Sequence, residues 1–306
     1  MQHIETIPEL RAACARARAG GGRVGLVPTM GYLHEGHRSL IRAARAAADL
    51  VVVTIFVNPL QFGATEDLDR YPRDLSGDLA ACEAEGADIV FAPPLQEMYP
   101  YGAPLTTVHV ERLTAGLCGL ARPTHFDGVT TVVTKLFAIT GPCIAFFGRK
   151  DAQQLAVITR MVTDLDLPVE VVGCPIVREA DGLAMSSRNA YLSSRERAAA
   201  LVLSRALEAG AGAVLAGERD AGATVAAAAR VVASEPGVEL EYLELRDAHD
   251  LTLCSGEIEG DVLLAVAARV GETRLIDNVM LSVGGAKAWA DLGIRRNLEG
   301  ATCNAR

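Results

Sequence analysis

The chain has 306 residues, enough for two domains of about 100 to 200 residues each with a large hydrophobic core. Its 29 Lys and Arg against 38 Asp and Glu leave a net charge of −9, which argues against a nucleic-acid or anionic-membrane surface. Apolar runs such as 49–57 and 261–268 are shorter than the roughly 20 residues that span a bilayer. Glu5 and Glu9 near the start are unlike a secretory signal, so we expect a cytoplasmic protein with no membrane segment and no nucleic-acid partner.

The seven cysteines contain no Cys-x-x-Cys pair, and no two of them stand closer than 25 positions apart. This spacing predicts neither a zinc knuckle nor a thioredoxin-type site. We expect buried thiols that pack as small hydrophobic side chains.

Predicted helices and strands alternate over the first part of the chain. A helix from Pro8 to Ala19 precedes a short buried strand at 24–27, a helical pattern from His37, and a β-branched strand at 49–57. Further elements are predicted at 77–85, 89–92, 129–139, 144–147, 153–164 and 169–174. This alternation predicts an α/β fold, a Rossmann-like doubly wound parallel sheet over residues 1–175, with a ligand crevice at the carboxyl ends of its strands.

The pattern changes beyond residue 175. Ser193 and Glu196 are spaced as a capping box that opens an Ala-rich helix to about Ala209. A second Ala-rich helix at 221–233 is followed by strands at 238–246, 261–269 and 273–281. We expect a smaller α+β C-terminal domain over 176–283 that closes over the site, and a loosely attached tail over 284–306.

Two familiar phosphate-binding motifs do not apply. Gly20, Gly22 and Gly25 match the dinucleotide fingerprint literally, but they precede the first buried strand, whereas the motif must follow it. No P-loop pattern occurs in the sequence. Any phosphate must therefore be bound in another way.

The loop after the first buried strand carries two histidines three positions apart. His34 and His37 fall at the start of the following helix, whose unpaired N–H groups and positive dipole end favour phosphate. A charge-assisted hydrogen bond from each imidazole would add about 1.5 to 3 kcal/mol. Two helix-capping histidines are the plain alternative, and a partial metal site lacks a third ligand nearby.

Two later segments also suggest phosphate chemistry. Lys150 follows a predicted strand, where it can neutralise a phosphoryl group, and Gln153 or Gln154 offers an amide to a hydroxyl or carboxylate. A solvated surface turn is the alternative. Further on, Met185–Ser186–Ser187–Arg188 places two hydroxyls and a guanidinium in one loop, a clamp for phosphate oxygens that would be ordinary loop composition by itself.

Other polar residues lie in loops expected to face the crevice. Asn58 and Gln61 follow the second buried strand, where turn chemistry is the alternative to ligand binding. Arg122 and His125 come before a predicted helix, and for them the alternative is an ion pair with Asp127.

Taken together, these segments resemble the pantothenate synthetase family, the pantoate:β-alanine ligases. This family belongs to a nucleotidyltransferase superfamily that shares a His-x-Gly-His loop with class I aminoacyl-tRNA synthetases. The similarity runs from about Val24 to about Val283, with five segments in the family's order, the last being Thr273–Arg274–Leu275–Ile276–Asp277–Asn278. The resemblance implies a ligase that forms a C–N amide bond: ATP and (R)-pantoate give pantoyl adenylate and pyrophosphate, then β-alanine attacks to give pantothenate and AMP. It also implies Mg²⁺ as cofactor and a homodimer.

The resemblance implies roles residue by residue. ATP would contact Met30, Gly31, Tyr32, Leu33, His34, Glu35, Gly36, His37, Gly148, Arg149, Lys150, Asp151, Val177, Met185, Ser186, Ser187 and Arg188. The catalytic group would comprise His34, His37, Lys150, Ser186, Ser187 and Arg188, with His37 also a proton donor. The small substrates would be bound by Gln61 and Gln154, with Asn58, Arg122 and His125 near the site. Asp78 would help place Mg²⁺.

Some positions depart from the family's pattern. Tyr32 stands where a small residue is usual, Arg149 where Glu is usual, Ala152 where a larger side chain is common, and Gly77 in place of one of two adjacent acids. None of these removes a catalytic side chain. Two other functions stay open: an adenylyltransferase or ligase for another small acid, and a catalytically silent nucleotide-binding protein.

Overall fold

The computed structural model describes residues 1–63, 66–285 and 287–296. The chain divides into two compact units. Of the described residues, the first contains Met1–Gly148 and Val157–Cys174, and the second contains Arg149–Ala156 and the chain from Pro175 to Arg296. The second unit's long segment begins at Pro175, one residue before the domain that we expect over 176–283, and Arg149–Ala156 groups with it rather than with the first unit.

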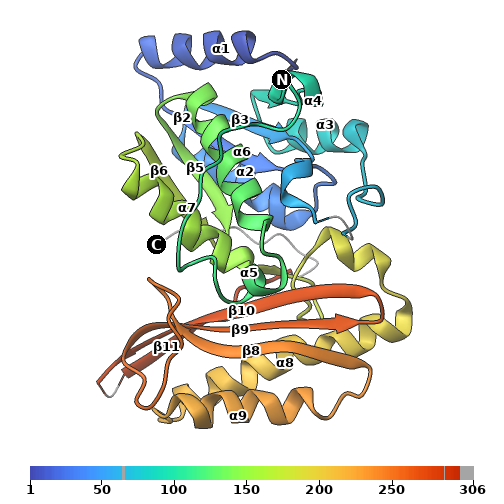
Figure 1. The fold of residues 1–306 in the computed structure, drawn as a ribbon, viewed down its shortest axis with the longest axis vertical. Helices are drawn as coiled ribbons and strands as arrows, with labels where there is room; N and C mark the ends of the chain where they lie inside the picture. The colour runs from blue at the N-terminus through green and yellow to red at the C-terminus, as the bar shows by residue number, and fades with distance from the viewer. Residues whose placement is uncertain (64–65, 286, 297–306) are drawn as a thin grey trace. The chain divides into compact units, whose positions relative to one another are not determined.

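A six-stranded parallel sheet forms the centre of the first unit, in the order β1-β4-β3-β2-β5-β6 (Figure 1). Its strands are β1 (Gln2–Ile4), β2 (Val24–Thr29), β3 (Leu50–Ile55), β4 (Ile89–Phe91), β5 (Cys143–Gly148) and β6 (Val169–Cys174). The order reverses between β2 and β5, which pair directly, so their carboxyl ends form the switch point where ligands of such sheets bind. The predicted fold class is confirmed.

Helices cover this sheet. They are α1 (Ile7–Ala19), α2 (Glu35–Ala47), α3 (Leu75–Ala84), α4 (Leu95–Met98), α5 (Cys118–Ala121), α6 (His125–Thr140) and α7 (Ala152–Asp164), with short 3-10 turns η1 (Pro59–Gln61) and η2 (Arg149–Asp151). Helix α2 packs on β2, β3 and β5, and α1 packs against α6 (Figure 1). Leu40, Ile41 and Ala44 of α2 are buried in one core cluster with strand residues, as their helical spacing predicts.

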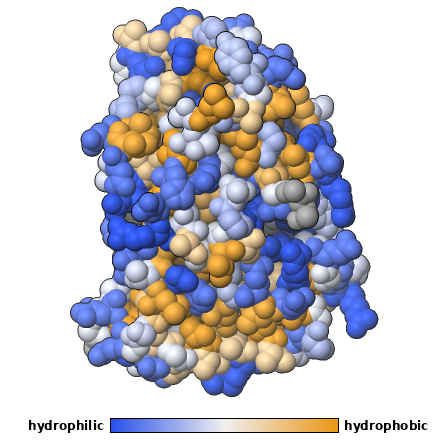
Figure 2. All heavy atoms as spheres, viewed as in Figure 1, coloured by the Kyte–Doolittle hydropathy of each residue, from blue (hydrophilic) through white to orange (hydrophobic). Residues whose placement is uncertain are grey.

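An antiparallel sheet in the order β11-β10-β9-β8 forms the second unit, with α8 and α9 packed on it. Its elements are β7 (Val177–Arg178), η3 (Ser187–Tyr191), α8 (Ser194–Leu215), α9 (Ala221–Val232), β8 (Val238–Asp247), β9 (Gly260–Val270), β10 (Thr273–Gly284), β11 (Lys287–Asp291) and β12 (Ile294–Arg295). Strands β12 and β7 form a small parallel pair. Hydrophobic residues gather on the surface where β8, α8 and α9 lie, in keeping with the Ala-rich sequence of both helices (Figure 2).

The predicted capping box at the start of α8 is confirmed. The Ser193 hydroxyl accepts a hydrogen bond from the Glu196 backbone N–H, and the Glu196 carboxylate accepts one from the Ser193 N–H. By length and composition α8 could cross a membrane, which our reading of short apolar runs overlooked. Half of its most apolar stretch is buried, and residues such as Leu203 and Leu207 pack in the core of the second unit, which accounts for its apolar character.

The structure differs from the loosely attached tail that we expect over residues 284–306. Beyond Gly284 the chain continues as β11, which pairs with β10, and as β12, which pairs with β7. Trp289 and its neighbours have little apolar periodicity, so nothing in the local pattern indicated strands whose partners lie elsewhere. Residues 286 and 297–306 of the expected tail lie outside the described part.

Five of the cysteines in the described residues are buried, and Cys254 is half-buried. Burial raises the pKa of Cys82 and of Cys143 to about 12, so both stay protonated and unreactive at neutral pH. Their expected packing role is confirmed, and Cys303 lies outside the described residues.

Candidate active site

The two histidines sit at the carboxyl end of β2 and hold the start of α2. His34 is the N-cap residue, and its Nδ1 accepts a hydrogen bond from the Gly36 N–H at 3.1 Å. The His34 N–H in turn donates to Nδ1 of His37 at 3.3 Å. Because each Nδ1 is an acceptor, the neutral rings carry their protons on Nε2. The centroids of the two rings lie 4.1 Å apart. Because capping uses the Nδ1 atoms, helix capping is compatible with ligand binding through the Nε2 atoms.

Asp78 of α3 shapes the loop between β2 and α2. Its two carboxylate oxygens accept the backbone N–H groups of Tyr32 at 2.8 Å and Leu33 at 2.6 Å. Burial raises the pKa of Asp78, these two hydrogen bonds counteract that shift, and the nearby Asp74 carboxylate adds to it. The carboxylate therefore orients the histidine loop through its backbone.

The same loop contains two residues with positive φ. Gly31 has φ of +83°, and a Cβ there would lie 2.8 Å from an Asp78 carboxylate oxygen, so the close approach requires glycine. Tyr32 has φ of 52°, a conformation that costs a non-glycine residue about 1 to 2 kcal/mol. The hydrogen bond from the Tyr32 N–H to Asp78 offsets part of that cost.

Asn58 and Gln61 form a buried amide pair at the end of β3. Asn58 Nδ2 donates to Gln61 Oε1 at 3.2 Å and to the Gly128 carbonyl, and Gln61 Nε2 contacts the Met30 sulfur at 2.9 Å. The Tyr99 hydroxyl donates to Asn58 Oδ1 at 2.9 Å, and burial raises the pKa of Tyr99 to about 12, so the donor keeps its proton. The Gln61 amide is thereby held close to the histidine loop.

Arg122 and His125 gather around the same turn. His125 Nδ1 lies 2.8 Å from the Gln61 carbonyl oxygen, and Arg122 Nη2 donates to that oxygen at 3.2 Å. Arg122 also forms an ion pair with Glu66. Burial acts to raise the pKa of Glu66, but the hydrogen bonds and charge of Arg122 outweigh it and lower that pKa. Asp127, the alternative partner considered for Arg122 and His125, forms an ion pair with His109 at 2.7 Å.

A cavity of about 470 Å³ opens in the first unit at the carboxyl ends of β2, β3 and β4. Met30, Gly31 and Asp78 line it from the histidine loop, and Arg73 and Asp74 line it from the segment before α3. Its place at this edge of the sheet agrees with the predicted crevice.

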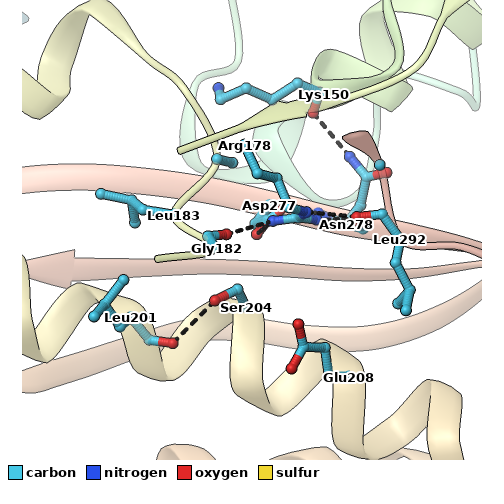
Figure 3. Close-up of polar contacts among 12 residues, drawn as sticks. Lys150, Arg178, Gly182, Leu183, Leu201, Ser204, Glu208, Asp277, Asn278 and Leu292 are labelled. Atoms are coloured by element: carbon cyan, nitrogen blue, oxygen red, sulfur yellow. Dashed lines mark hydrogen bonds and ion pairs between the residues drawn. The ribbon is translucent and has the colours of Figure 1, made fainter. Parts of the chain in front are cut away.

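Lys150 lies in the turn η2 directly after β5. The Asn278 side chain donates to the carbonyl oxygens of Arg149 at 3.0 Å and Lys150 at 2.8 Å. Arg149 is further tied to Asp291 by an ion pair of 2.8 Å. The Lys150 side chain extends away from Asn278 (Figure 3). The backbone that carries this lysine is therefore held by β10 and by the end of β11.

The Ser-Ser-Arg loop follows β7 in the second unit. The Met185 N–H donates to the Val177 carbonyl at 3.0 Å, which places the two predicted nucleotide contacts side by side. Ser186 caps η3 by accepting a hydrogen bond from the Arg188 N–H at 3.3 Å. Asn189 Nδ2 donates to the Ala184 carbonyl, and this hydrogen bond joins the residue after the loop to the residue before it.

The first unit thus brings together one group of predicted site residues and the second unit another. Met30 to His37, Asn58, Gln61, Asp78, Arg122, His125 and Gly148 belong to the first, and Arg149 to Asp151, Gln154, Val177 and Met185 to Arg188 to the second. Gln154 is half-buried at the start of α7. In the described part of the chain, no group of three or more His, Cys, Asp or Glu side chains could hold a metal ion.

Sequence reasoning missed several residues that support the site. Glu66, Arg178 and Asn278 were given no role, although Asn278 ends the quoted segment Thr273–Asn278. Buried polar side chains in a strand were the available signal, because such groups need partners. Which partners they have depends on pairing across the fold, which the sequence does not display.

Fold and histidine loop define a class: a Rossmann-like protein with the start of a helix at the switch point of its parallel sheet, a place where proteins of such folds bind phosphate groups. The family model for pantoate-beta-alanine ligase matches residues 2–280. The pantothenate synthetase of Heliobacterium modesticaldum is 54% identical over 283 residues, covering 92% of this chain and all of the relative.

Solved structures agree. The crystal structure of pantothenate synthetase from Thermus thermophilus has a TM-score of 0.86 and 48% identity, covering 91% of this chain and 98% of that one. The pantoate-beta-alanine ligase of Francisella tularensis, complexed with beta-gamma ATP and beta-alanine, has a TM-score of 0.72 and 30% identity, with 91% and 97% covered. The chain belongs to the pantoate-beta-alanine ligase family and has the ligase activity of that family.

Proposed function

We propose that the chain joins (R)-pantoate to β-alanine in two steps at the residues described above. In the first step a pantoate carboxylate oxygen attacks the α-phosphorus of ATP, the bond to the β-phosphate breaks, and pyrophosphate leaves. In the second step the β-alanine nitrogen attacks the acyl carbon, loses a proton, and expels AMP. The adenylate is needed because a free carboxylate is a poor electrophile, whereas AMP is a leaving group of low basicity.

The histidine pair carries this proposal. With Nδ1 of each ring accepting a backbone N–H, the Nε2–H groups are the donors that His34 and His37 can offer to phosphate oxygens. The positive end of α2 adds to the attraction at the same place. The Nε2–H of His37 would also donate a hydrogen bond to the departing pyrophosphate, in keeping with the donor role that the resemblance implies.

In the second unit, the Lys150 ammonium and the Arg188 guanidinium would neutralise charge that develops on the phosphates during pyrophosphate departure. Ser186 and Ser187 would add hydroxyl hydrogen bonds, and Asp151 would accept the ribose hydroxyls. Val177 would contact adenine through its backbone. The geometry that supports these roles is the hydrogen bond from the Met185 N–H to the Val177 carbonyl, which keeps the adenine contact beside the Ser-Ser-Arg loop.

Gln61 and Gln154 would bind pantoate through its hydroxyl and carboxylate groups. The 3.2 Å contact from Asn58 to Gln61 Oε1 fixes which end of the Gln61 amide is the acceptor, and so which end can donate. Arg122 and His125 would act one step away, because both hold the Gln61 carbonyl. Paired amides suit a small hydroxy acid better than a nucleotide acceptor.

Mg²⁺ would enter as the ATP complex, since this ion keeps several waters and binds through substrate phosphates with one or two carboxylates. Asp78 fits that chemistry as an oxygen donor at the cavity, although both its oxygens already accept backbone N–H groups. A homodimer in the cytoplasm stays a prediction from the resemblance; size-exclusion chromatography with light scattering would test the oligomeric state.

A ligase for a different small acid is the second candidate. It shares every phosphate contact and differs only at the amide pair of Gln61 and Gln154. AMP formation should be measured with ATP, Mg²⁺ and β-alanine against pantoate and a panel of hydroxy and keto acids of similar size. We expect AMP and pantothenate in equal amounts with pantoate. A different preferred acid would keep the mechanism and overturn the substrate, and no AMP with any acid would refute the proposed function.

A further inference from the structure

Two adjacent residues of β10, Asp277 and Asn278, are buried polar side chains with 4% and 3% exposure. Because successive residues of a strand point to opposite faces, the two side chains work on different sides of the sheet. Asn278 holds the carbonyls of Arg149 and Lys150, and Asp277 binds Arg178 (Figure 3). One short segment thus contacts the backbone of Arg149 and Lys150 in η2 and the side chain of Arg178, the neighbour of Val177 in β7.

The buried Asn278 side chain lowers the stability of the strand interior. Its Oδ1 is buried without a hydrogen-bond partner among the described residues, and such an acceptor lowers stability compared with an apolar side chain. Its Nδ2 donates both hydrogens, at 3.0 Å and 2.8 Å, to the carbonyls beside and on Lys150. The contacts of its backbone with Asp277 and Arg178 do not depend on the side chain. The hold on the lysine's backbone is therefore what the amide contributes.

Asp277 anchors the other group through Arg178 of β7. The pair is bidentate, at 2.6 Å and 2.9 Å, and Arg178 also donates to the carbonyls of Leu292, Gly182 and Asn278. All five guanidinium N–H groups are thus used, which is the condition for a stable buried ion pair. Arg178 follows Val177 directly, and the turn at Gly182 precedes the Ser-Ser-Arg loop by three residues.

We propose that Asn278 is a positioning residue for Lys150: its amide holds the backbone of η2 so that the ammonium stays aligned with the phosphates, while Asp277 holds the β7 side through Arg178. This inference rests on the proposed function only in taking the phosphates of ATP as the target of Lys150. A free η2 turn would let the ammonium shift by the order of an ångström, a displacement that can cost about 100-fold in rate.

A double-mutant cycle tests whether Asn278 acts through Lys150. The variants are Asn278→Ala, Lys150→Ala and the pair, measured by pantoate-dependent pyrophosphate exchange into ATP. We expect Asn278→Ala to lower kcat by about 10- to 100-fold with KM for pantoate unchanged. In the Lys150→Ala background, the same substitution should lower kcat by less than about a further 3-fold. Effects that multiply in the double variant would overturn the proposal.

Asn278→Asp sharpens the test, because it keeps the shape but turns an acceptor oxygen toward two carbonyls. We expect it to impair exchange more than Asn278→Ala does, and equal or weaker impairment would count against the proposal. Thr224→Ala is the matched control: Thr224 of α9 is buried in the same unit, and its hydroxyl is also unpartnered among the described residues. It removes a buried polar group of the same unit that forms no hydrogen bond with η2 in the described part of the chain, and it should leave kcat per folded enzyme unchanged.

A second readout separates this inference from the proposed function. The Kd of ATP, measured by calorimetry without any acid, should rise in Asn278→Ala and in Lys150→Ala and rise no further in the pair. Exchange that fails with pantoate in the unmodified chain would refute the proposed substrate, whereas additive effects on the Kd of ATP would refute the positioning role whatever the acid.

Discussion

The histidine loop and the η2 turn are supported in different ways. The first is held by contacts close in sequence, with His34 and His37 capping their own helix, and by the more distant Asp78 carboxylate, which fixes the loop. The second is held by β10, whose residues Asp277 and Asn278 lie 99 to 129 positions from their partners. The comparison teaches that local changes in the first region should alter chemistry, whereas changes in the second should alter folding and chemistry together.

The largest effect is expected at the buried ion pair. Arg178→Met should lower the free energy of unfolding by about 3 to 5 kcal/mol, because it leaves Asp277 charged and buried without its partner. Denaturant unfolding would measure this change. The double variant Arg178→Met/Asp277→Leu should recover much of the loss, and a double variant as unstable as the single one would contradict the desolvation argument.

At the histidine loop, two substitutions of one residue should separate capping from chemistry. His37→Asn keeps an acceptor near Nδ1 and removes Nε2, whereas His37→Gln keeps a donor near Nε2 and removes the cap acceptor. We expect His37→Asn to lower the exchange rate by about 10² to 10³-fold with little change in stability. His37→Gln should retain more activity and lose more stability, and the reverse ranking would break the comparison.

Asp78→Asn should reduce activity more than stability. The amide offers one acceptor where the carboxylate offers two, so one N–H of Tyr32 or Leu33 loses its partner, a cost of about 1 to 3 kcal/mol or about 10- to 100-fold in rate. Because burial raises the pKa of Asp78, the folded state gains by losing this charge, which offsets the loss in unfolding free energy. Pyrophosphate exchange rates and thermal melts of the variant would measure the two effects separately. A loss of stability as large as the loss of activity would argue for a purely structural carboxylate.

The smallest effect is expected at Tyr32. Tyr32→Gly removes a backbone strain of about 1 to 2 kcal/mol, but the greater freedom of glycine in the unfolded chain costs about 0.4 to 1 kcal/mol, so stability should rise by up to about 1.6 kcal/mol. The melting temperature would show it. A clear loss of stability would mean that the exposed tyrosine ring makes contacts worth more than the strain.

The same division explains what could be predicted from the sequence. The strand at 169–174 and the helix ends near Ala19, Asp164 and Val232 follow local patterns and were predicted within about one or two residues, the usual uncertainty of element ends. Strands β1, β7, β11 and β12 were missed because they are short and defined by distant partners. The position of the two histidines at the start of α2 could be predicted because helix capping depends on residues close in sequence. The support of Lys150 by Asn278 was not, because strand pairing and burial decide it.

The central claim is that the chain forms an acyl adenylate at the histidine loop and Lys150. Labelled pyrophosphate exchange into ATP, with Mg²⁺ and pantoate but without β-alanine, tests it most directly. The account predicts exchange that requires pantoate and falls by about 10² to 10³-fold in Lys150→Ala. Exchange that ignores pantoate, or that Lys150→Ala leaves near its original rate, would contradict it.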